Sequence, residues 1–372
     1  MDISLFSGKP VLPIGLPKEI KTDERRVALI PGDCEKIIAR GAEIFFEKGA
    51  GEGSGFSDEA YLAAGAVLAK DAAEIYERAR LIVKVKEPQP SELSFLRSHH
   101  TLFCFLHLGG NPELTAELLQ IGLTGYAFET FNIEGKTALL SPMSSIAGRL
   151  SIFNGAHYLQ PICGGRGTLL GGIGLSHGIG DQNGGVVTIL GAGVAGYAAL
   201  DLALATGARV HIFDLLPSKI DALRKSHPKA HSFVNTPDDV SCRDRLCEVL
   251  EESDLLVGAV YVPGKRAPVV VDREMMALMP RGSVAFDIAV DQGGCFATTR
   301  PCTHSEPTYI AEGVIHSAVT NLPAAAPRSA SVALSGVITP YALALSCAPD
   351  PESDPVIQSG LNLAGGKLVI AL

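Results

Sequence analysis

One stretch of the sequence, residues 186–214, restricts the fold more than any other. It begins with an apolar run, Val186 to Leu190, that is typical of a buried parallel strand. A glycine motif of the form G-x-G-x-x-G follows, and then an alanine- and leucine-rich helical pattern and a second strand that ends in Asp214. The motif consists of Gly191, Gly193 and Gly196. This order predicts a Rossmann-type strand–helix–strand unit that binds a dinucleotide.

Each glycine of this motif has its own physical role. Gly191 allows a tight turn, Gly193 lets a pyrophosphate approach the backbone, and Gly196 lets the helix pack closely on the strand. The N-terminus of the helix then offers N–H groups and the positive end of its dipole to the phosphates. Asp214 follows about twenty residues later, where a carboxylate accepts from both ribose hydroxyls and repels a 2′-phosphate. The sequence therefore predicts NAD in preference to NADP.

The composition indicates an acidic globular protein with reduced thiols. Hydrophobic residues make up 47% of the 372 residues, which is enough for more than one core. The net charge of −9 argues against nucleic acid or an anionic membrane as a partner. The eight cysteines are scattered without a CxxC pair, so we expect no metal site. The N-terminal residues lack the pattern of a signal peptide, which favours a cytoplasmic location.

Residues 1–141 also alternate short strands with short helices. Such alternation predicts a mostly parallel sheet, with functional residues gathered beyond the carboxyl ends of its strands. Three polar residues, Lys86, His107 and Glu129, directly follow predicted strands in this region. Lys84 lies two residues before Lys86 on the same face of its strand, so spacing alone does not choose between the two lysines.

The fold class that we predict is α/β, with two Rossmann-like domains, each a mostly parallel sheet flanked by helices, and a cleft between them. A helical pattern from Met143 to Leu159 leads out of the first region. An uncharged stretch, Ser329 to Pro349, is long enough to span a membrane, but its serines and internal proline favour a core helix. We expect a substrate domain formed by residues 1–141 plus 325–372, and a Rossmann domain formed by residues 142–324.

Motifs along essentially the whole chain resemble those of the L-alanine dehydrogenase family. In chain order they are PKEIKTDERRVALIP, EKGAGEGSGF, KVKEP, FLHL, AFET, SPMSSIAGR, GGRGTLLGG, GAGVAG, VGAVYVPG, DIAVDQGGCF and GLNLAGGKL. The same superfamily contains the NAD-binding subunit of proton-translocating transhydrogenase, which lacks the FLHL histidine motif. The chain therefore resembles the dehydrogenase branch, and the resemblance implies a two-domain subunit that forms a homohexamer.

The resemblance implies chemical roles for four residues. Arg26, rather than Arg25, would hold a substrate carboxylate, because a guanidinium offers a planar two-point clamp. Lys86 would stabilise negative charge on the substrate oxygen, and His107 would act as general acid and base. Asp291, in a glycine-rich turn, would orient the attacking water or ammonia. Without the resemblance, each of these residues also fits a structural role: a surface charge, an edge-strand charge, a satisfied histidine or a turn cap.

The glycine motif and the family resemblance together imply a set of residues that contact the cofactor. They are Ser144, Gly191, Gly193, Gly196, Asp214, Lys219, Val260 and Asn321. The sequence departs from the usual family pattern at Phe128, Ser145 and Leu322, which leaves the exact side chain of the substrate open. Asp287, inside a predicted strand, is interpreted as structural.

The functional hypothesis is the NAD-dependent oxidative deamination of L-alanine to pyruvate and ammonium, together with the reverse reductive amination. Its partners would be these small molecules, with no nucleic acid and no membrane. Two alternatives stay open: a related amino-acid dehydrogenase with another side-chain preference, and a transhydrogenase-like NAD-binding subunit docked to a membrane partner. The set Arg26, Lys86, His107 and Asp291 argues against the second alternative.

Overall fold

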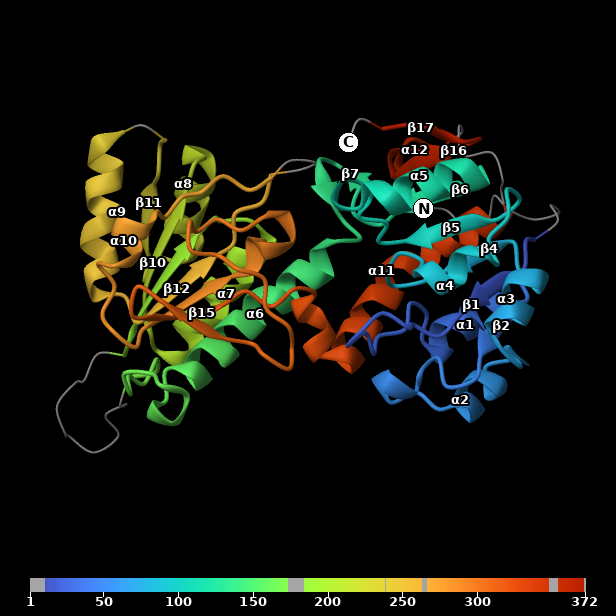
Figure 1. Cartoon of the computed structure of the whole chain (residues 1–372), viewed down its shortest axis with the longest axis horizontal. Helices are drawn as coiled ribbons and strands as arrows, with labels where there is room; N and C mark the ends of the chain where they lie inside the picture. The colour runs from blue at the N-terminus through green and yellow to red at the C-terminus, as the bar shows by residue number, and fades with distance from the viewer. Residues whose placement is uncertain (1–10, 173–183, 238, 263–265, 348–353, 371–372) are drawn as a thin grey trace. The chain divides into compact units, whose positions relative to one another are not determined.

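The chain forms two compact units in the computed structural model, which describes residues 11–172, 184–237, 239–262, 266–347 and 354–370. One unit consists of residues 1–143 and 324–372, and the other of residues 144–323. Each unit is an α/β structure with a mostly parallel sheet flanked by helices, which confirms the predicted α/β class with two Rossmann-like domains (Figure 1).

The first unit is built on an eight-stranded sheet with the strand order β17-β16-β6-β5-β4-β1-β2-β3. The strands are β1 (Ile14–Leu16), β2 (Ile44–Glu47), β3 (Val67–Ala69), β4 (Leu81–Val83), β5 (Thr101–Cys104), β6 (Thr124–Ala127), β16 (Leu361–Ala364) and β17 (Lys367–Leu368). The six strands from β1 to β6 are parallel, whereas β16 runs antiparallel to β6 and β17 antiparallel to β16. Figure 1 draws β16 and β17 in red beside the teal β6, so the C-terminal residues complete a sheet begun by the N-terminal ones.

Short helices connect these strands. They are α1 (Pro31–Ile38), α2 (Asp58–Ala63), α3 (Ala72–Arg78), α4 (Pro90–Leu93), α5 (Pro112–Ile121) and α12 (Pro355–Gly360), with the 3₁₀ turns η2 (Glu52–Ser54) and η3 (Leu108–Gly110) and the small hairpin β7 (Asn132–Ile133) and β8 (Lys136–Thr137). Side-chain caps define several helix starts: Ser57 accepts from the N–H of Ala60, and Asp71 accepts from the N–H of Glu74.

The long apolar stretch near the C-terminus forms α11 (Pro327–Cys347), which packs inside the first unit. By length and composition it is the one helix in the described residues that qualifies as a membrane span, yet 61% of its apolar window is buried in the protein. The hydroxyls of Ser331 and Ser335 accept hydrogen bonds from the N–H groups of Val27 and Ile30, at 2.9 and 3.0 Å. The serines that interrupt the apolar pattern thus anchor the segment that carries Arg26, as expected of a core helix.

The second unit is built on a seven-stranded sheet with the order β11-β10-β9-β12-β13-β15-β14, parallel except for β14. Its strands are β9 (Val186–Leu190), β10 (Arg209–Asp214), β11 (His231–Val234), β12 (Leu255–Gly258), β13 (Val284–Asp287), β14 (Tyr309–Ala311) and β15 (Val314–Ser317). Its helical segments are α6 (Ser141–Tyr158), which starts in the first unit, η4 (Pro161–Cys163), α7 (Val194–Thr206), α8 (Pro217–Ser226), α9 (Val240–Glu252), α10 (Arg273–Met276), η5 (Ile288–Gln292) and η6 (Leu322–Ala325).

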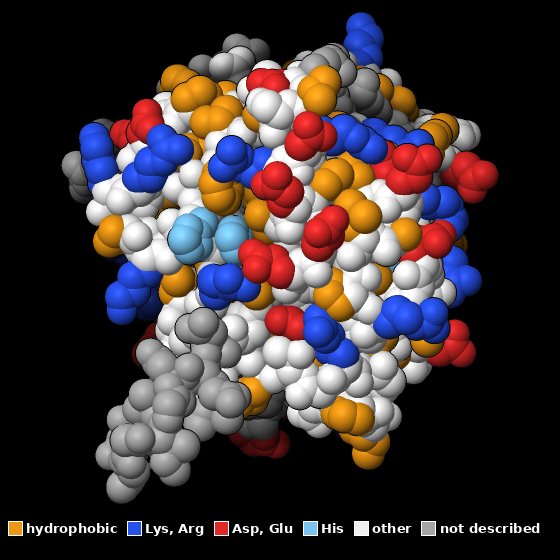
Figure 2. All heavy atoms as spheres, turned by 90° about the vertical axis from the view of Figure 1, so that its left-hand side faces the viewer, with side chains coloured by type: hydrophobic (Ala, Val, Ile, Leu, Met, Phe, Trp, Pro, Cys, Tyr) orange, Lys and Arg blue, Asp and Glu red, His pale blue; other side chains and the backbone are white. Residues whose placement is uncertain are grey.

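The core of the second unit lies around the central strand β9, whose five residues are all buried. The helix α7 packs on β9, β10 and β12, which fixes the glycine motif at the carboxyl end of β9. Figure 2 shows one outer face of this unit, on which acidic and basic side chains are mixed and neither charge gathers into a continuous patch.

Candidate functional site

The backbone of His107 is held in an unusual conformation where the chain leaves β5. Its φ of 48° lies in the left-handed region, which residues other than glycine rarely adopt. The carboxylate of Glu129 accepts hydrogen bonds from the N–H groups of His107, at 2.6 Å, and of Leu106, at 3.1 Å. Glu129 follows β6 and His107 follows β5. Because these two strands pair side by side, the carboxylate of Glu129 lies next to the backbone of His107.

The ring of His107 contacts a second carboxylate. Its Nδ1 lies 3.3 Å from Oε2 of Glu87, and the other oxygen of Glu87 forms a close ion pair with Lys21. Burial alone would raise the pKa of Glu87, but the hydrogen bond and charge of His107, the hydrogen bond of Lys21 and the charge of Lys86 lower it to about 2. Glu87 is therefore ionised at neutral pH, and the His107 side chain, 40% exposed, keeps access to solvent.

The structure separates the two lysines that spacing left equivalent. The side chain of Lys84 is fully buried, and its Nζ lies 2.8 Å from Glu92 and 3.3 Å from Glu19. Strand β4 ends at Val83, so the alternation of faces assumed for Lys84 and Lys86 does not extend to them. Lys84 belongs to a buried ion-pair network, whereas the charge of Lys86 acts on Glu87.

A third carboxylate, Glu19, holds the backbone between the two lysines. It accepts a hydrogen bond from the N–H of Val85 at 2.6 Å and lies 3.4 Å from the N–H of Lys86. Complete burial raises the pKa of Glu19, against the opposing charge of Lys84. The backbone of the segment that carries Lys86 is thus held by hydrogen bonds to Glu19, a buried acid from the N-terminal part of the chain.

Arg26 is buried, only 2% exposed, whereas the neighbouring Arg25 is exposed. Its guanidinium forms a two-point pair with Glu24, through Nε at 2.7 Å and Nη2 at 2.5 Å, and its Nη1 lies 3.1 Å from the sulfur of Met143. A substrate carboxylate would have to meet the Nη1–Nη2 edge, because Glu24 holds the Nε–Nη2 edge. A hollow of about 430 Å³ is lined by Glu19, Glu24, Arg26 and neighbouring residues of η2.

The glycine motif of the second unit has the geometry predicted for it. Gly191 has a φ of 100°, and a Cβ there would lie 2.5 Å from the carbonyl oxygen of Ala259. A Cβ on Gly196 would lie 1.8 Å from the carbonyl oxygen of Gly191. A Cβ on Gly193, in contrast, would have no protein atom within 4 Å. The fold requires glycine at the first and third positions, while the second, the N-cap of α7, opens on space.

Asp214 ends β10 next to this motif and organises it. Its Oδ2 accepts a hydrogen bond from the N–H of Ala192 at 2.6 Å, and its Oδ1 accepts one from Leu216 at 2.9 Å. The ammonium of Lys219 lies 3.3 Å from Oδ2. The loop after β12 touches the same motif, since a Cβ on Gly191 would lie 3.2 Å from the nitrogen of Val260. Asp214, Lys219 and Val260 therefore surround the carboxyl end of β9.

For two further expected cofactor contacts, Ser144 and Asn321, the structure gives the position in the fold and the backbone conformation. Ser144 lies on α6, one turn before Gly148, where a Cβ would meet the carbonyl oxygen of Ala195 at 2.0 Å. This face of α6 therefore packs on the first turn of α7. Asn321, which follows β15, has a φ of 58°, so its backbone is also left-handed.

The turn after β13 presents Asp291 at the surface. Asp291 is exposed within η5, whereas Asp287 is buried and accepts hydrogen bonds from the N–H groups of Ala289 and Cys295, at 2.9 and 2.8 Å. Thr299 also donates to Asp287, and burial raises the pKa of this carboxyl. These contacts agree with the structural interpretation of Asp287, which fixes the turn on which Asp291 lies.

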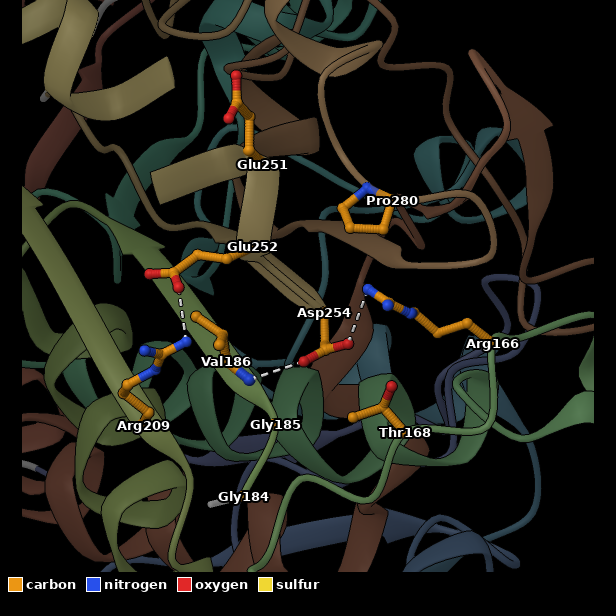
Figure 3. A pocket seen from close by; sticks show the side chains of 10 residues that line it. All are labelled: Arg166, Thr168, Gly184, Gly185, Val186, Arg209, Glu251, Glu252, Asp254 and Pro280. Atoms are coloured by element: carbon orange, nitrogen blue, oxygen red, sulfur yellow. Dashed lines mark hydrogen bonds and ion pairs between the residues drawn. The ribbon is translucent and has the colours of Figure 1, made fainter. Parts of the chain in front are cut away.

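A separate hollow of about 380 Å³ lies at the other end of the central strand (Figure 3). The N–H of Val186, the first residue of β9, donates to Asp254 at 2.8 Å, and Asp254 pairs with Arg166 at 3.1 Å. Arg209 pairs with Glu252 at 2.6 Å. Because these charges neutralise one another at the amino end of β9, opposite the glycine motif, we interpret this hollow as structural.

Sequence reasoning missed the acids that organise the first-unit site: Glu19, Glu24 and Glu87, with Lys21. Among the described residues, no group of three His, Cys, Asp or Glu side chains is arranged to hold a metal ion. The signal that could have found Glu87 was its place beside Lys86 in KVKEP, just beyond a strand end. The other partners come from a segment without regular structure, whose side-chain directions follow no period.

The comparisons with known proteins agree with this architecture. The family model "Alanine dehydrogenase/PNT, N-terminal domain" matches residues 15–147, and "Alanine dehydrogenase/PNT, C-terminal domain" matches residues 151–371. The chain is 42% identical to the alanine dehydrogenase of Halomonas elongata, over 95% of this chain and 94% of the relative. It is 41% identical to that of Bacillus subtilis, over 95% and 92%.

Solved structures give the same picture. An L-alanine dehydrogenase superposes with a TM-score of 0.89 at 40% identity, covering 96% of this chain and 97% of that one. A transhydrogenase from Sinorhizobium meliloti superposes with a TM-score of 0.81 at 24% identity, covering 96% and 98%, and shows a shared fold alone.

Proposed function

Because the chain belongs to the alanine dehydrogenase/PNT family, we propose that it catalyses the oxidative deamination of L-alanine to pyruvate and ammonium with NAD⁺ and water, and the reverse reaction. The observation that carries this proposal is the set of contacts in the first unit. Glu24 contacts Arg26, Glu19 contacts the backbone of Lys86, and Glu87 contacts His107, so that three groups suited to a 2-oxo acid share one end of one sheet.

The second unit would hold the cofactor, a nicotinamide dinucleotide. The residues fit such a group: Gly193 opens on space at the N-terminus of α7, and Asp214 lies beside the motif. When bound, the nicotinamide would accept a hydride from the α-carbon of the substrate. Ser144, Lys219, Val260 and Asn321 complete the proposed set of cofactor contacts. The Asp214 carboxylate favours NAD, because it would repel a 2′-phosphate.

The first unit would hold the substrate. Arg26 would bind the substrate carboxylate through its Nη1–Nη2 edge, and the ammonium of Lys86 would stabilise negative charge on the carbonyl or carbinolamine oxygen. His107 would take and return the proton of that hydroxyl or of the amine through its Nε2. Asp291, on the second unit, would orient water or ammonia.

We further propose that residues 1–141 plus 325–372 act as the substrate domain and residues 142–324 as the NAD-binding domain. The assembly would be a homohexamer and the location cytoplasmic. The proposed partners are L-alanine, pyruvate and ammonium.

An absorbance assay at the NADH band tests this proposal. The protein should consume NADH only when a 2-oxo acid and ammonium are both present, fastest with pyruvate and more slowly with bulkier 2-oxo acids. Consumption that is faster with another 2-oxo acid would identify a related amino-acid dehydrogenase. Binding of NADH without consumption of any 2-oxo acid would instead favour a transhydrogenase-like subunit.

A further inference from the structure

The carboxylate of Glu87 lies between two cations and has no role in the reaction proposed above. One oxygen, Oε2, lies 3.3 Å from Nδ1 of His107, and the other, Oε1, is paired with Lys21. The side chain is only 9% exposed, so water screens these contacts weakly. An acid that is buried in this way either stabilises the fold alone or acts on the chemistry through the histidine.

The direction of the His107 contact favours an action on the chemistry. An ionised carboxylate only accepts hydrogen bonds, so the contact with Glu87 requires a proton on Nδ1 of His107. In the neutral ring the other nitrogen, Nε2, is then the one with a lone pair. A histidine fixed in this tautomer offers a base at Nε2, away from the carboxylate.

The backbone of His107 is fixed independently of the ring. Glu129 binds the N–H groups of Leu106 and His107 and holds the left-handed backbone, whereas Glu87 contacts the ring. The two acids therefore have different roles. Glu129 fixes the backbone from which the side chain projects, and Glu87 fixes the orientation and protonation of the ring. Two further charges lie around this group, the ammonium groups of Lys21 and Lys86, and burial keeps the neighbouring thiol of Cys104 neutral by raising its pKa.

We propose that Glu87 is a positioning residue that sets the tautomer of His107 and stabilises its protonated form, and that Lys21 moderates this effect by sharing the same carboxylate. The kinetic part of this proposal rests on the function proposed above. Lys21 and His107 contact different oxygens of the Glu87 carboxylate. Loss of the negative charge of Glu87 and loss of the positive charge of Lys21 should therefore act on the His107 ring in opposite directions.

Two variants test the proposal through the pH profile of kcat/KM for pyruvate. Glu87→Gln removes the negative charge beside the ring, so the limb that depends on His107 should move to lower pH. Lys21→Met removes a positive charge, so the same limb should move to higher pH. The expected shift is roughly 0.5–1 pH unit each way, because the ring is partly exposed. Turnover of Glu87→Gln should fall about 10- to 100-fold, by analogy with the loss of carboxylates that orient metal-bound histidines.

The matched control is Glu77→Gln, which removes an exposed carboxylate from α3 of the same unit and should leave the profile unchanged. If Glu87 had only a structural role, the rate would fall in Glu87→Gln and Lys21→Met, but the limb of the pH profile would not move in opposite directions. Shifts in the same direction, or an unmoved limb in Glu87→Gln, would overturn the proposal.

A second measurement does not depend on activity. In protein labelled with ¹⁵N-histidine, the ring shifts of His107, assigned by their loss in His107→Asn, report which nitrogen carries the proton. The neutral ring should carry it on Nδ1, and a neutral ring protonated on Nε2 would contradict the role of Glu87. If the unaltered protein consumes no NADH with pyruvate and ammonium, the proposed function fails, while this measurement still decides the tautomer.

Discussion

The second unit builds its candidate cofactor site from backbone, whereas the first unit builds its candidate substrate site from side chains. In the second unit, a six-residue motif beginning at Gly191 sets the shape of the turn, and a single side chain, Asp214, ties it to the next strand. In the first unit, residues from Glu19 to Glu129 converge, and buried acids pair with the side chains of Arg26, Lys84 and His107.

This difference has a physical origin. Phosphates are recognised by N–H groups at a helix N-terminus, which any sequence supplies if glycines let the ligand approach. A carboxylate or a proton requires particular functional groups at particular positions, and buried charges need partners. The second site should therefore be sensitive to the addition of a Cβ, and the first to the loss of a charge.

The largest effect on stability is expected at Lys84, the lysine that sequence spacing could not distinguish from Lys86. Lys84→Met leaves Glu19 and Glu92 buried without their cation, so the free energy of unfolding should fall by about 3–5 kcal/mol. Lys86→Met should lose turnover and destabilise the fold less, because Glu87 keeps Lys21 and His107 as partners. Urea unfolding of both variants measures the difference, and equal stability losses would show that the two lysines are equivalent.

A pair of glycine variants tests the backbone site. In Gly196→Ala the new Cβ overlaps the carbonyl oxygen of Gly191, so NADH affinity should fall at least 100-fold, about 3 kcal/mol. Gly193→Ala meets no protein atom, so its thermal unfolding should match the parent while NADH affinity falls roughly tenfold. Calorimetric titration with NADH reads both variants. Parental affinity in Gly193→Ala would mean that the space is not used by the phosphates.

The acids of the first unit should make its stability depend on pH. Since the folded pKa of Glu87 lies at about 2, below its ordinary value of 4.5, its stabilising effect is complete above about pH 4.5 and is lost as the pH falls toward 2. The loss attributable to Glu87 is about 3 kcal/mol at most. Comparing the unfolding free energy of the parent with that of Glu87→Gln between pH 5 and pH 2 isolates this contribution. The variant should show a flatter dependence, and parallel curves would contradict the assignment.

The smallest effect is expected at Asp214, the side chain that contacts the glycine motif, and it concerns the preference for NAD over NADP. Asp214→Ala removes both the acceptor for Ala192 and the charge that repels a 2′-phosphate, so the preference for NAD over NADP should narrow roughly tenfold. The control is Lys219→Met, which keeps the carboxylate and should not narrow the preference. Equal use of NAD and NADP by the parent would show that Asp214 does not select the cofactor.

The comparison also explains what the sequence could predict. The strand, motif and helix of the second unit are contiguous, so their order was readable, and the structure has β9 at the predicted bounds Val186–Leu190. The buried environment of Arg26 was not readable from the charged run around it, because its burial depends on Glu24 and on α11, about three hundred residues away.

The two lysines show the limit most plainly. Alternation holds only within a strand, and β4 ends at Val83, one residue before Lys84. Both lysines are buried, and which of them joins the ion-pair network depends on Glu19 and Glu92, which come from other parts of the chain. Likewise, Glu87 was visible as a residue of KVKEP, but its contact with His107 depends on the pairing of β4 with β5.

The most direct test of this account is a single variant, His107→Asn, measured in two ways on one preparation. Asparagine tolerates the left-handed backbone of this position but does not transfer protons at neutral pH. NADH consumption with pyruvate and ammonium should fall about 10²–10⁴-fold, while the dissociation constant for NADH should stay at the parental value. A folded variant that binds NADH and consumes it at the parental rate would contradict the account.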